Sequence, residues 1–477
     1  MNSLAKITKK YVIHTKMETL APIRIASGMD DGITDIIILK NKQGKAFIPG
    51  TSLAGVLRSA MKNIYGEEVV AHIFGHIKNN GGEQSMLNIS DIILDGSELI
   101  YRDGVAIDTY RGVGKKGAKY DFEALDKGAF GELCIEMTVR NKQKPFDITY
   151  LHNDFAVSGD FYSEVIATIV DLLTGGISVG SLTTKGFGLI GSKKPTELYC
   201  FDFTDGAADK WLAYITESKL PKAFYIGSAD KVAAGNMNVF TIEADFAVSS
   251  SLIIRDYDEA QEINDANGKK DLKLAAVQMK SGADLIIPGS SIKGALRSRA
   301  QKIIMSLSGG AVKEAQDFVA TLMGFADDSK ACKSRLSVRE SYISSKTLVS
   351  HRHSRNRIDR FTCSTIDGAL FTEEPVWQRD KSLSPLKLSL SVNQCSDVEA
   401  GLMLLLLKDL WLGMLPLGGG KGIGRGTLIG RQCKIYYKRE AFVIKEGESF
   451  EINGDSAKLE QYMQAFVKCA KEMAVKR

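Results

Sequence analysis

The chain has 477 residues, and 62 Lys and Arg against 57 Asp and Glu give a formal net charge of +5. Hydrophobic residues make up 44% and charged residues 25%, which excludes a disordered or collagen-like chain. The small net charge also excludes a protein that binds nucleic acid by bulk positive charge alone, so such binding would need locally concentrated cations. At about 150 residues per domain, the length predicts roughly two or three domains.

Neither a membrane span nor a disulfide framework is expected. The most apolar stretch, 401–418, carries Lys408 and Asp409 in its middle and is shorter than the ~20 apolar residues of a membrane helix. The N-terminal residues lack the apolar region of a secretory signal. The 7 cysteines are scattered without C-x-x-C spacing. We therefore expect a protein of the reducing cytoplasm with no membrane partner.

The chain contains an internal repeat. Residues 48–59 read Ile-Pro-Gly-Thr-Ser-Leu-Ala-Gly-Val-Leu-Arg-Ser and match residues 287–298, Ile-Pro-Gly-Ser-Ser-Ile-Lys-Gly-Ala-Leu-Arg-Ser, at eight of twelve positions. The glycine-rich runs 180–188 and 418–426 also correspond. Such a repeat indicates tandem copies of one domain. We predict domains at 1–232 and 236–477, with a small, polar join within 228–237.

The hydrophobic patterns predict similar elements in both copies. Ser52 follows Pro49 and is the expected N-cap of a helix. For the first copy we predict a strand over 11–20, a helix over 52–65, a strand over 130–139 and a helix over 165–173, with a short apolar run at 35–39. For the second copy we predict a strand-like opening over 240–254, a helix over 291–305, a strand over 386–392, and helices over 402–412 and 457–473. This order predicts an α+β fold with a ferredoxin-like (RRM-like) core in each copy.

The glycine-rich runs are candidate phosphate sites. Glycines allow close approach and expose backbone N–H groups, and the runs carry Lys185 in the first copy and Lys421 and Arg425 in the second. They match neither the P-loop nor the dinucleotide-binding motif. A tight turn between a helix and a strand is the alternative interpretation.

The repeated Pro-Gly segments are a second candidate. A helix N-terminus at Ser52 would present donors to an anion, with Arg58 about two turns further on. Lys293 and Arg297 hold similar positions in the second copy. A Pro-Gly-x-Ser sequence that merely begins a helix is the alternative, but it does not explain the repeated Gly and Arg.

Positive charge is most concentrated near residue 355. Residues 351–361 contain four arginines, two histidines and one acid. The first copy has a Gly- and Lys-rich counterpart within 101–119. Such segments fit flexible arms on a nucleic-acid backbone, and solvated or RNA-facing histidines are favoured over metal ligands. The candidate RNA-binding residues here are Lys115, Lys116, Arg352, Arg355, Arg357 and Arg360.

Together these motifs resemble the RAMP superfamily of CRISPR-associated proteins, and most closely the backbone subunits of type III effector complexes. Two fused copies resemble the double backbone subunit of type III-D complexes or their variants. The resemblance implies two tandem RAMP domains with inserted thumb-like arms. It also implies binding of a CRISPR guide RNA, contact with target RNA and with other effector subunits, and cleavage of target RNA by an aspartate with a divalent metal such as Mg²⁺.

The resemblance makes Asp35 the candidate catalytic residue and metal ligand, because it matches the family's Gly-x-x-Asp pattern in the loop before Pro49. Asp30 and Asp31 are alternates. A carboxylate there would hold a hydrated metal or orient a ribose 2′-OH. Without the resemblance, a turn cap is the simpler interpretation of Asp35.

In the second copy the equivalent position falls near Leu274 and is not acidic. Asp256, Asp258 and Asp271 are the nearest acids, and none clearly matches. We predict that the second copy binds RNA and either does not cleave it or cleaves with a different geometry.

Three alternatives stay open. The first is a purely structural guide-RNA-binding subunit without catalysis. The second is a CRISPR RNA-processing endonuclease of the same superfamily, disfavoured because such enzymes use histidine chemistry and the chain has only 6 histidines. The third is a small-nucleotide-binding protein, against which the failed motif matches weigh.

Overall fold

The chain divides into two compact units in the computed structural model. The first comprises Met1–Thr183 and Phe187–Asn236, and the second comprises Thr184–Gly186 and Met237–Arg477. The join predicted at 228–237 lies entirely outside the described residues. The structure describes residues 6–30, 32, 34–78, 81–108, 114–141, 161–192, 194–217, 223–225, 238–256, 262–264, 270–272, 275–326, 330–446 and 451–475.

The first unit is built on an antiparallel sheet with β1 at its centre. β9 pairs with one edge of β1 and both β11 and β12 with the other, while β5 lies beyond β9. One helix, α1, follows β1 in the chain, and a second, α2, follows β9. This is the strand order of a ferredoxin-like fold. The elements are β1 (Ile7–Thr19), α1 (Gly50–Phe74), β5 (Leu87–Ile89), β9 (Phe130–Arg140), α2 (Phe161–Gly175), β11 (Leu189–Ser192) and β12 (Thr196–Asp202).

The second unit repeats this order. β14 is central, β29 and β30 flank it, and β23 lies beyond β29. The prediction of two tandem ferredoxin-like domains in an α+β chain is therefore confirmed. The elements are β14 (Phe240–Val248), α5 (Gly289–Leu307), α6 (Val312–Met323), β23 (Leu336–Val338), β29 (Leu386–Val392), α7 (Asp397–Trp411), β30 (Leu428–Tyr437), β31 (Glu440–Lys445), β32 (Glu451–Asn453) and α8 (Ser456–Val475).

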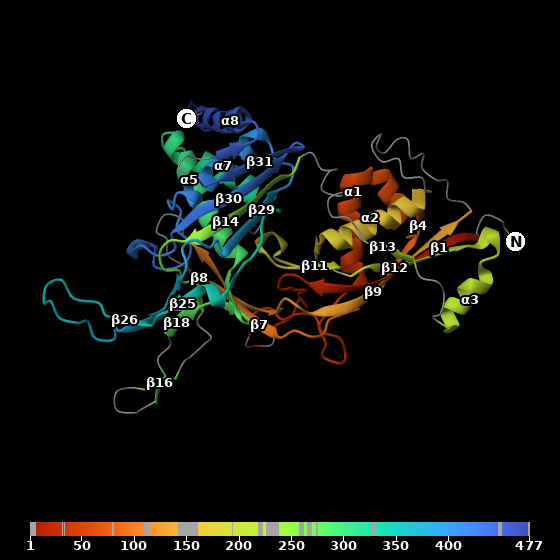
Figure 1. Ribbon diagram of the computed structural model, residues 1–477, viewed down its shortest axis with the longest axis horizontal. Helices are drawn as coiled ribbons and strands as arrows, with labels where there is room; N and C mark the ends of the chain where they lie inside the picture. The colour runs from red at the N-terminus through yellow and green to blue at the C-terminus, as the bar shows by residue number, and fades with distance from the viewer. Residues whose placement is uncertain are drawn as a thin grey trace. The chain divides into compact units, whose positions relative to one another are not determined.

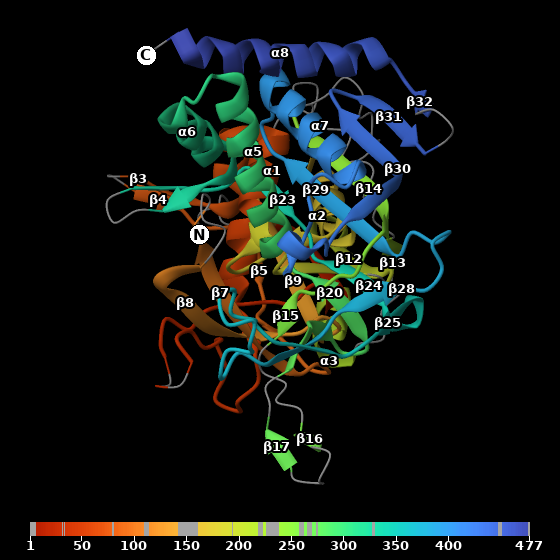
Figure 2. The same cartoon turned by 90° about the vertical axis from the view of Figure 1, so that its left-hand side faces the viewer.

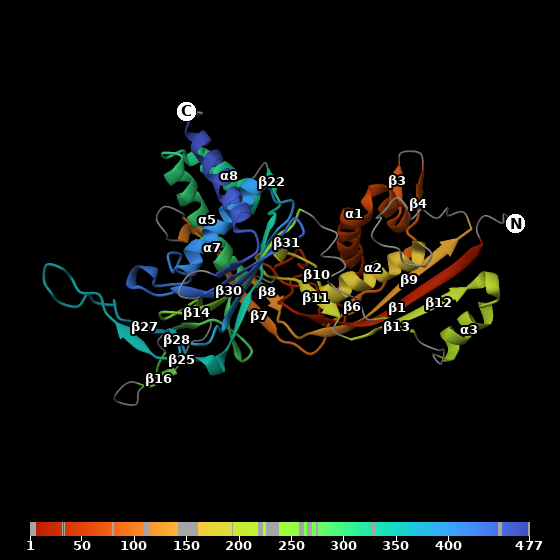
Figure 3. The same cartoon turned by 45° about the horizontal axis from the view of Figure 1, so that its top comes forward.

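The alternation of β1 explains how its sheet is covered. Tyr11 and Ile13 point into the main core, which α1 and α2 cover from one side (Figure 3). Val12 points to the other face, where Trp211 and Tyr214 of α3 (Ala208–Glu217) pack against it. Successive residues of a strand face opposite sides, so a single strand serves both layers.

The first helix of each domain is interrupted at a similar place. In α1, Gly66 has φ 84° and ψ 172°, so the helix continues only after a kink. In the second unit the chain instead ends α5 and begins α6. The predicted helix over 52–65 therefore covers the part before the kink. Its predicted cap is wrong, because the N-cap residue is Pro49, which has no side-chain capping bond, and not Ser52.

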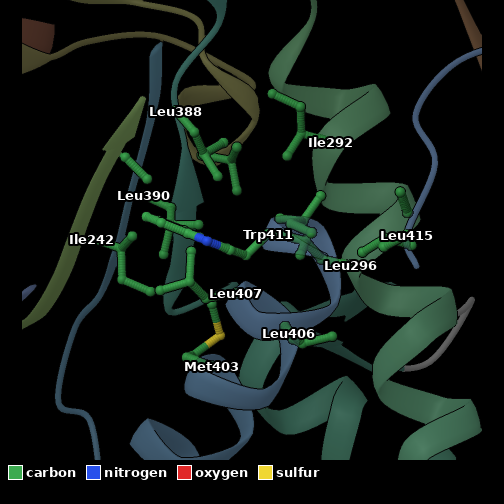
Figure 4. Packing of buried hydrophobic residues seen from close by; sticks show 14 of the residues in the cluster. Ile242, Ile292, Leu296, Leu388, Leu390, Met403, Leu406, Leu407, Trp411 and Leu415 are labelled. Carbon is green, nitrogen blue, oxygen red and sulfur yellow. The ribbon is translucent and has the colours of Figure 1, made fainter. Parts of the chain in front are cut away.

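The core of the second unit centres on Trp411 of α7. Its ring lies among Ile242, Leu390 and Leu407, and Phe246 meets it edge-on at 6.1 Å (Figure 4). Gly430 is required beneath the ring, because a Cβ there would lie 2.0 Å from it. α8 runs across α7 (Figure 2), as expected for an amphipathic terminal helix.

Each unit carries an inserted arm built from antiparallel strands. The first arm, residues 99–125, is formed by β7 (Leu99–Ile107) and β8 (Gly114–Leu125). The second arm, residues 348–378, is formed by β25 (Leu348–Ser350), β26 (His353–Arg355), β27 (Phe371–Glu374) and β28 (Val376–Gln378), and it extends away from its own sheet (Figure 1). The thumb-like arms expected from the resemblance are thus present as hairpins.

The apolar run at 35–39 is not a regular strand. Ile36 and Ile38 make single bridges, to Phe122 and Ala26 respectively. Within the described part of the chain, no helix is long and apolar enough to span a membrane.

Candidate functional site

The repeated Gly and Arg of the Pro-Gly segments have structural roles. A Cβ on Gly50 would lie 2.1 Å from the Ile89 carbonyl oxygen, and one on Gly289 would lie 2.5 Å from that of Val338. Only glycine lets each helix begin so close to the neighbouring strand.

The arginines cap the end of the interrupted helix. Arg58 Nη1 donates to the Gly75 carbonyl at 3.0 Å, and Arg297 Nη2 donates to the Gly324 carbonyl at 2.5 Å. Both glycines are the C-cap residues of their helices. These donors satisfy carbonyls that a helix end leaves free, so each guanidinium has a structural role.

The expected anion site at the start of α1 is filled by the protein itself. The Gly50 N–H donates to Asp91 Oδ1 at 2.8 Å, so a carboxylate already meets this positive helix end. The Ser52 N–H donates to the Pro49 carbonyl at 2.9 Å, and its side chain is half-buried.

Lys293 is also held inside the protein. It is buried, and its Nζ donates to Ser334 Oγ at 2.7 Å and to the Leu336 carbonyl at 2.9 Å. Burial, together with neighbouring cations, lowers the pKa of Lys293 to about 7. We leave Lys293, like Arg58 and Arg297, out of the proposed RNA surface.

The glycine-rich runs are hydrogen-bonded through their backbone to the loop that follows the central strand in each unit. Gly188 N–H donates to the Pro22 carbonyl and Gly426 N–H to that of Ser251, both at 2.7 Å. A Cβ on Gly188 or Gly426 would lie 2.1 or 1.8 Å from a backbone oxygen, and both have φ near +80°. The tight-turn interpretation thus accounts for these glycines.

The cations of these runs differ in exposure. Lys421 is exposed and Lys185 half-buried, whereas Arg425 is buried. Arg425 Nη1 and Arg255 Nη2 each donate to Glu373 at 2.6 Å. Burial alone would raise the pKa of Glu373, but these hydrogen bonds outweigh it and lower the pKa. Arg425 therefore fixes the base of the second arm instead of facing a ligand.

The tip of the second arm is an ordered, exposed, cationic loop. Asp359 Oδ1 accepts the N–H groups of Phe361 at 2.8 Å and Thr362 at 2.9 Å. These backbone bonds lower the pKa of Asp359 and use its charge to fix the turn. Phe361, which is 97% exposed, and Arg360 project from this turn.

The other arginines of this arm differ in exposure and in pairing. Arg357 is exposed and Arg355 half-buried. Arg352 is exposed but pairs with Glu374, with Nη2 3.0 Å from Oε2. In the first arm, Lys115 and Lys116 are exposed on β8, while residues 109–113 lie outside the described residues.

Asp35 lies against the first arm. Its N–H donates to Asp121 Oδ1 at 2.9 Å, and its Oδ2 accepts the Asp121 N–H at 3.0 Å. Within the described part of the chain, Asp35 Oδ1 accepts no hydrogen bond. The carboxylate is therefore held by one oxygen, and the other is available at an exposed position.

The alternates differ from Asp35. Asp30 is exposed and its Oδ1 accepts the Gly32 N–H at 3.2 Å, so it shapes only its own turn. Asp31 lies outside the described residues. Sequence reasoning missed Asp121, which is 86 residues from Asp35 and has no local spacing signal. It also missed Phe361, whose signal was an aromatic residue at the end of a basic run.

The register identifies the second-unit counterpart of Asp35. Ile36 bridges Phe122 in parallel, and Ala276 pairs with Glu373 in parallel. Leu125 and Val376 make equivalent bridges, to Ile23 and Leu252. Counting back one residue from Ala276 places Ala275 where the first unit has Asp35. This position is adjacent to Leu274, near which it was expected, and it has no carboxylate.

No group of three or more His, Cys, Asp or Glu side chains that would hold a metal occurs among the residues that the structure describes. Mg²⁺ in proteins is commonly held by one or two carboxylates together with substrate phosphates and water. The donor chemistry of Asp35 with its available oxygen fits this mode.

A family model identifies the superfamily to which the chain belongs. The chain matches the family model of the RAMP superfamily over residues 16–190 and 224–429. No curated protein sequence matches it. A solved chain from the type III-B Cmr-beta complex bound to cognate target RNA is similar at 12% identity and a TM-score of 0.29, over 41% of this chain and 61% of that one. The family match covers more than half of the chain, in two regions, so this protein belongs to the RAMP superfamily.

Proposed function

We propose that this chain is a CRISPR RNA-binding backbone subunit of a type III effector complex whose first unit cleaves guide-paired target RNA at Asp35. The observation that carries the proposal is the position of Asp35, tied by one carboxylate oxygen to the base of an arm. An RNA distorted by that arm would meet the other oxygen.

The arms supply the RNA-binding surface. Arg357 and Arg360 project from a turn whose only acid, Asp359, is occupied by backbone N–H groups. An exposed cation attracts phosphate, and an aromatic ring such as Phe361 stacks on bases without regard to sequence. Sequence would then be read by base pairing with the guide, as in other RNA-guided systems.

A salt titration tests this binding surface. The variant carries Arg355→Ala, Arg357→Ala and Arg360→Ala together, and the control removes the exposed cations Lys313, Lys468 and Lys471 from α6 and α8. Each phosphate contact to single-stranded RNA contributes about 0.7 to the salt slope, so three lost contacts would reduce the slope by about 2. The control should keep the original slope, and an unchanged slope in the arm variant would contradict this surface.

The chemical step needs little from the protein. Asp35 would hold a divalent metal or orient the ribose 2′-OH for attack on the adjacent phosphorus, and the arm would help bring these atoms into line. As the new bond forms, the P–O5′ bond breaks, which leaves a 2′,3′-cyclic phosphate on one fragment and a 5′-hydroxyl on the other. Bound Mg²⁺ would stabilise negative charge on the phosphate oxygens. In the second unit Ala275 offers no carboxylate, so we assign cleavage to the first unit and RNA binding to both.

The cleavage assay compares Asp35→Ala with Asp30→Ala in an assembled complex given Mg²⁺ and complementary RNA. Asp30 is the matched control because it is an exposed acid of the same loop. Asp35→Ala should slow one class of cuts by at least about 100-fold with guide RNA still bound, and Asp30→Ala should cut normally. Full cutting at every site by Asp35→Ala would refute Asp35 as the catalytic residue.

A further inference from the structure

The loop that carries Asp35 is fastened to the first arm by a short ladder of bonds. Besides the two bonds between Asp35 and Asp121, the Glu123 N–H donates to the Ile36 carbonyl at 2.9 Å, and the Ile38 N–H donates to Glu123 Oε2 at 3.0 Å. Asp121 and Glu123 are two residues apart on β8, so they share one face of that strand. Each accepts one backbone N–H of the loop.

Asp121 restrains both the backbone and the side chain of Asp35. The Asp121 carboxylate fixes the backbone of Asp35 through its N–H, and the Asp121 N–H fixes the direction of the Asp35 carboxylate. With its backbone and one side-chain oxygen both held, Asp35 has little rotational freedom left. The other oxygen therefore points in a defined direction.

The second unit shows that this carboxylate pair is not needed for the fold. Its loop strand β18 (Ala275–Gln278) still pairs in parallel with β27. The register places Thr372 at the position of Asp121 and Ala275 at that of Asp35, and Thr372 Oγ1 lies 3.1 Å from Ser354 Oγ on the neighbouring strand. Both carboxylates are absent together from the unit for which no cleavage is proposed.

We propose that Asp121 is a positioning residue that holds Asp35 in its reactive orientation and couples it to the first arm. This inference rests on the proposed role of Asp35 in cleavage. Because Asp35 is hydrogen-bonded to Asp121 of β8, an RNA that binds the arm would also align the carboxylate that acts on it. Asp121 itself acts through its hydrogen bonds and need not touch the substrate.

The test compares Asp121→Ala, Asp121→Asn and Asp103→Ala in the assembled complex. Asp103 is the matched control because it faces Asp121 across the hairpin and pairs with Lys119. Single-turnover cleavage, the Mg²⁺ concentration for half-maximal rate, guide-RNA retention and thermal unfolding are measured for each variant, with Asp35→Ala alongside.

Asp121→Ala should slow cleavage about 10- to 100-fold, since a misplacement of about 1 Å costs up to about 100-fold. Asp121→Asn should stay within about threefold of the parent, because its amide oxygen still accepts the Asp35 N–H. Guide retention, Mg²⁺ dependence and Asp103→Ala should be unchanged. Rescue by Asn separates positioning from a charged or metal-binding role.

Two results would overturn the inference. Cleavage by Asp121→Ala at the parental rate would show that Asp35 needs no support. Asp121→Asn as slow as Asp121→Ala, with a raised Mg²⁺ requirement, would make Asp121 a metal ligand instead. If Asp35→Ala itself cleaves normally, the proposed function fails, and this outcome is distinct from both.

Discussion

Replacing Gly50 by alanine tests the structural account of the repeated Pro-Gly segment. The new Cβ would lie 2.1 Å from the Ile89 carbonyl oxygen, whereas ordinary contacts begin at 3.4 Å, so the overlap is 3.4 − 2.1 = 1.3 Å. The obstructing atoms belong to the backbone of β5 and Ser90, so no side chain can rotate away. Relief requires α1 to move from the strand, which costs about 1–3 kcal/mol.

Gly55 supplies the opposite case in the same helix. It is exposed, and a Cβ there meets nothing within 4 Å. Gly55→Ala should therefore stabilise the helix by up to about 1 kcal/mol. The two substitutions are chemically identical and lie five residues apart in the same helix.

Calorimetric unfolding of the intact chain measures both effects. At about 2–4 °C per kcal/mol, Gly50→Ala should lower the midpoint of the first unit by roughly 2–12 °C, and Gly55→Ala should raise it by about 2–4 °C. RNA affinity of the folded Gly50→Ala protein should be close to the parent. Equal, small shifts for both variants would refute the close contact between α1 and β5.

Two further predictions concern the second unit. The pKa of Lys293 is lowered from 10.5 to about 7 in the folded protein, so between these pH values only the unfolded chain binds the extra proton. The free energy of unfolding should therefore rise with pH from about 7 to 10.5. Urea unfolding should show a flatter pH dependence for Lys293→Met, and equal slopes would count against this reasoning. Arg297→Ala should cost about 1–3 kcal/mol by uncovering the Met323 and Gly324 carbonyls, whereas Lys302→Ala on the exposed side of α5 should change unfolding by less than about 0.5 kcal/mol.

The sequence predicted the regular elements well because their patterns are local. Alternation identified β1 and β29, and apolar helical spacing identified α2 and α7. The internal repeat identified the tandem domains before any strand order was known. Register is different, because it is set by pairing between distant segments. The sequence therefore placed the second-unit counterpart of Asp35 only near Leu274, whereas the strand pairing places it at Ala275.

The site was less predictable for the same reason. Arg58 reaches Gly75 and Gly50 meets Ile89, and neither partner is visible in the motif. The sequence therefore does not distinguish a repeated glycine or arginine that contacts a ligand from one that contacts the protein itself. Asp121 gave no signal at all, since only the folding of the arm onto the loop brings it to Asp35.

Ultraviolet cross-linking of the chain to its bound guide RNA, followed by mass spectrometry, tests the central claim most directly. The account predicts cross-linked peptides from the two arms, at Phe361 with its flanking arginines and at Lys115 and Lys116, all exposed. The exposed lysines of α8 should not be cross-linked. Cross-links confined to α8 or to the outer sheet face, with the arms untouched, would contradict the assignment of the arms as the RNA-binding surface.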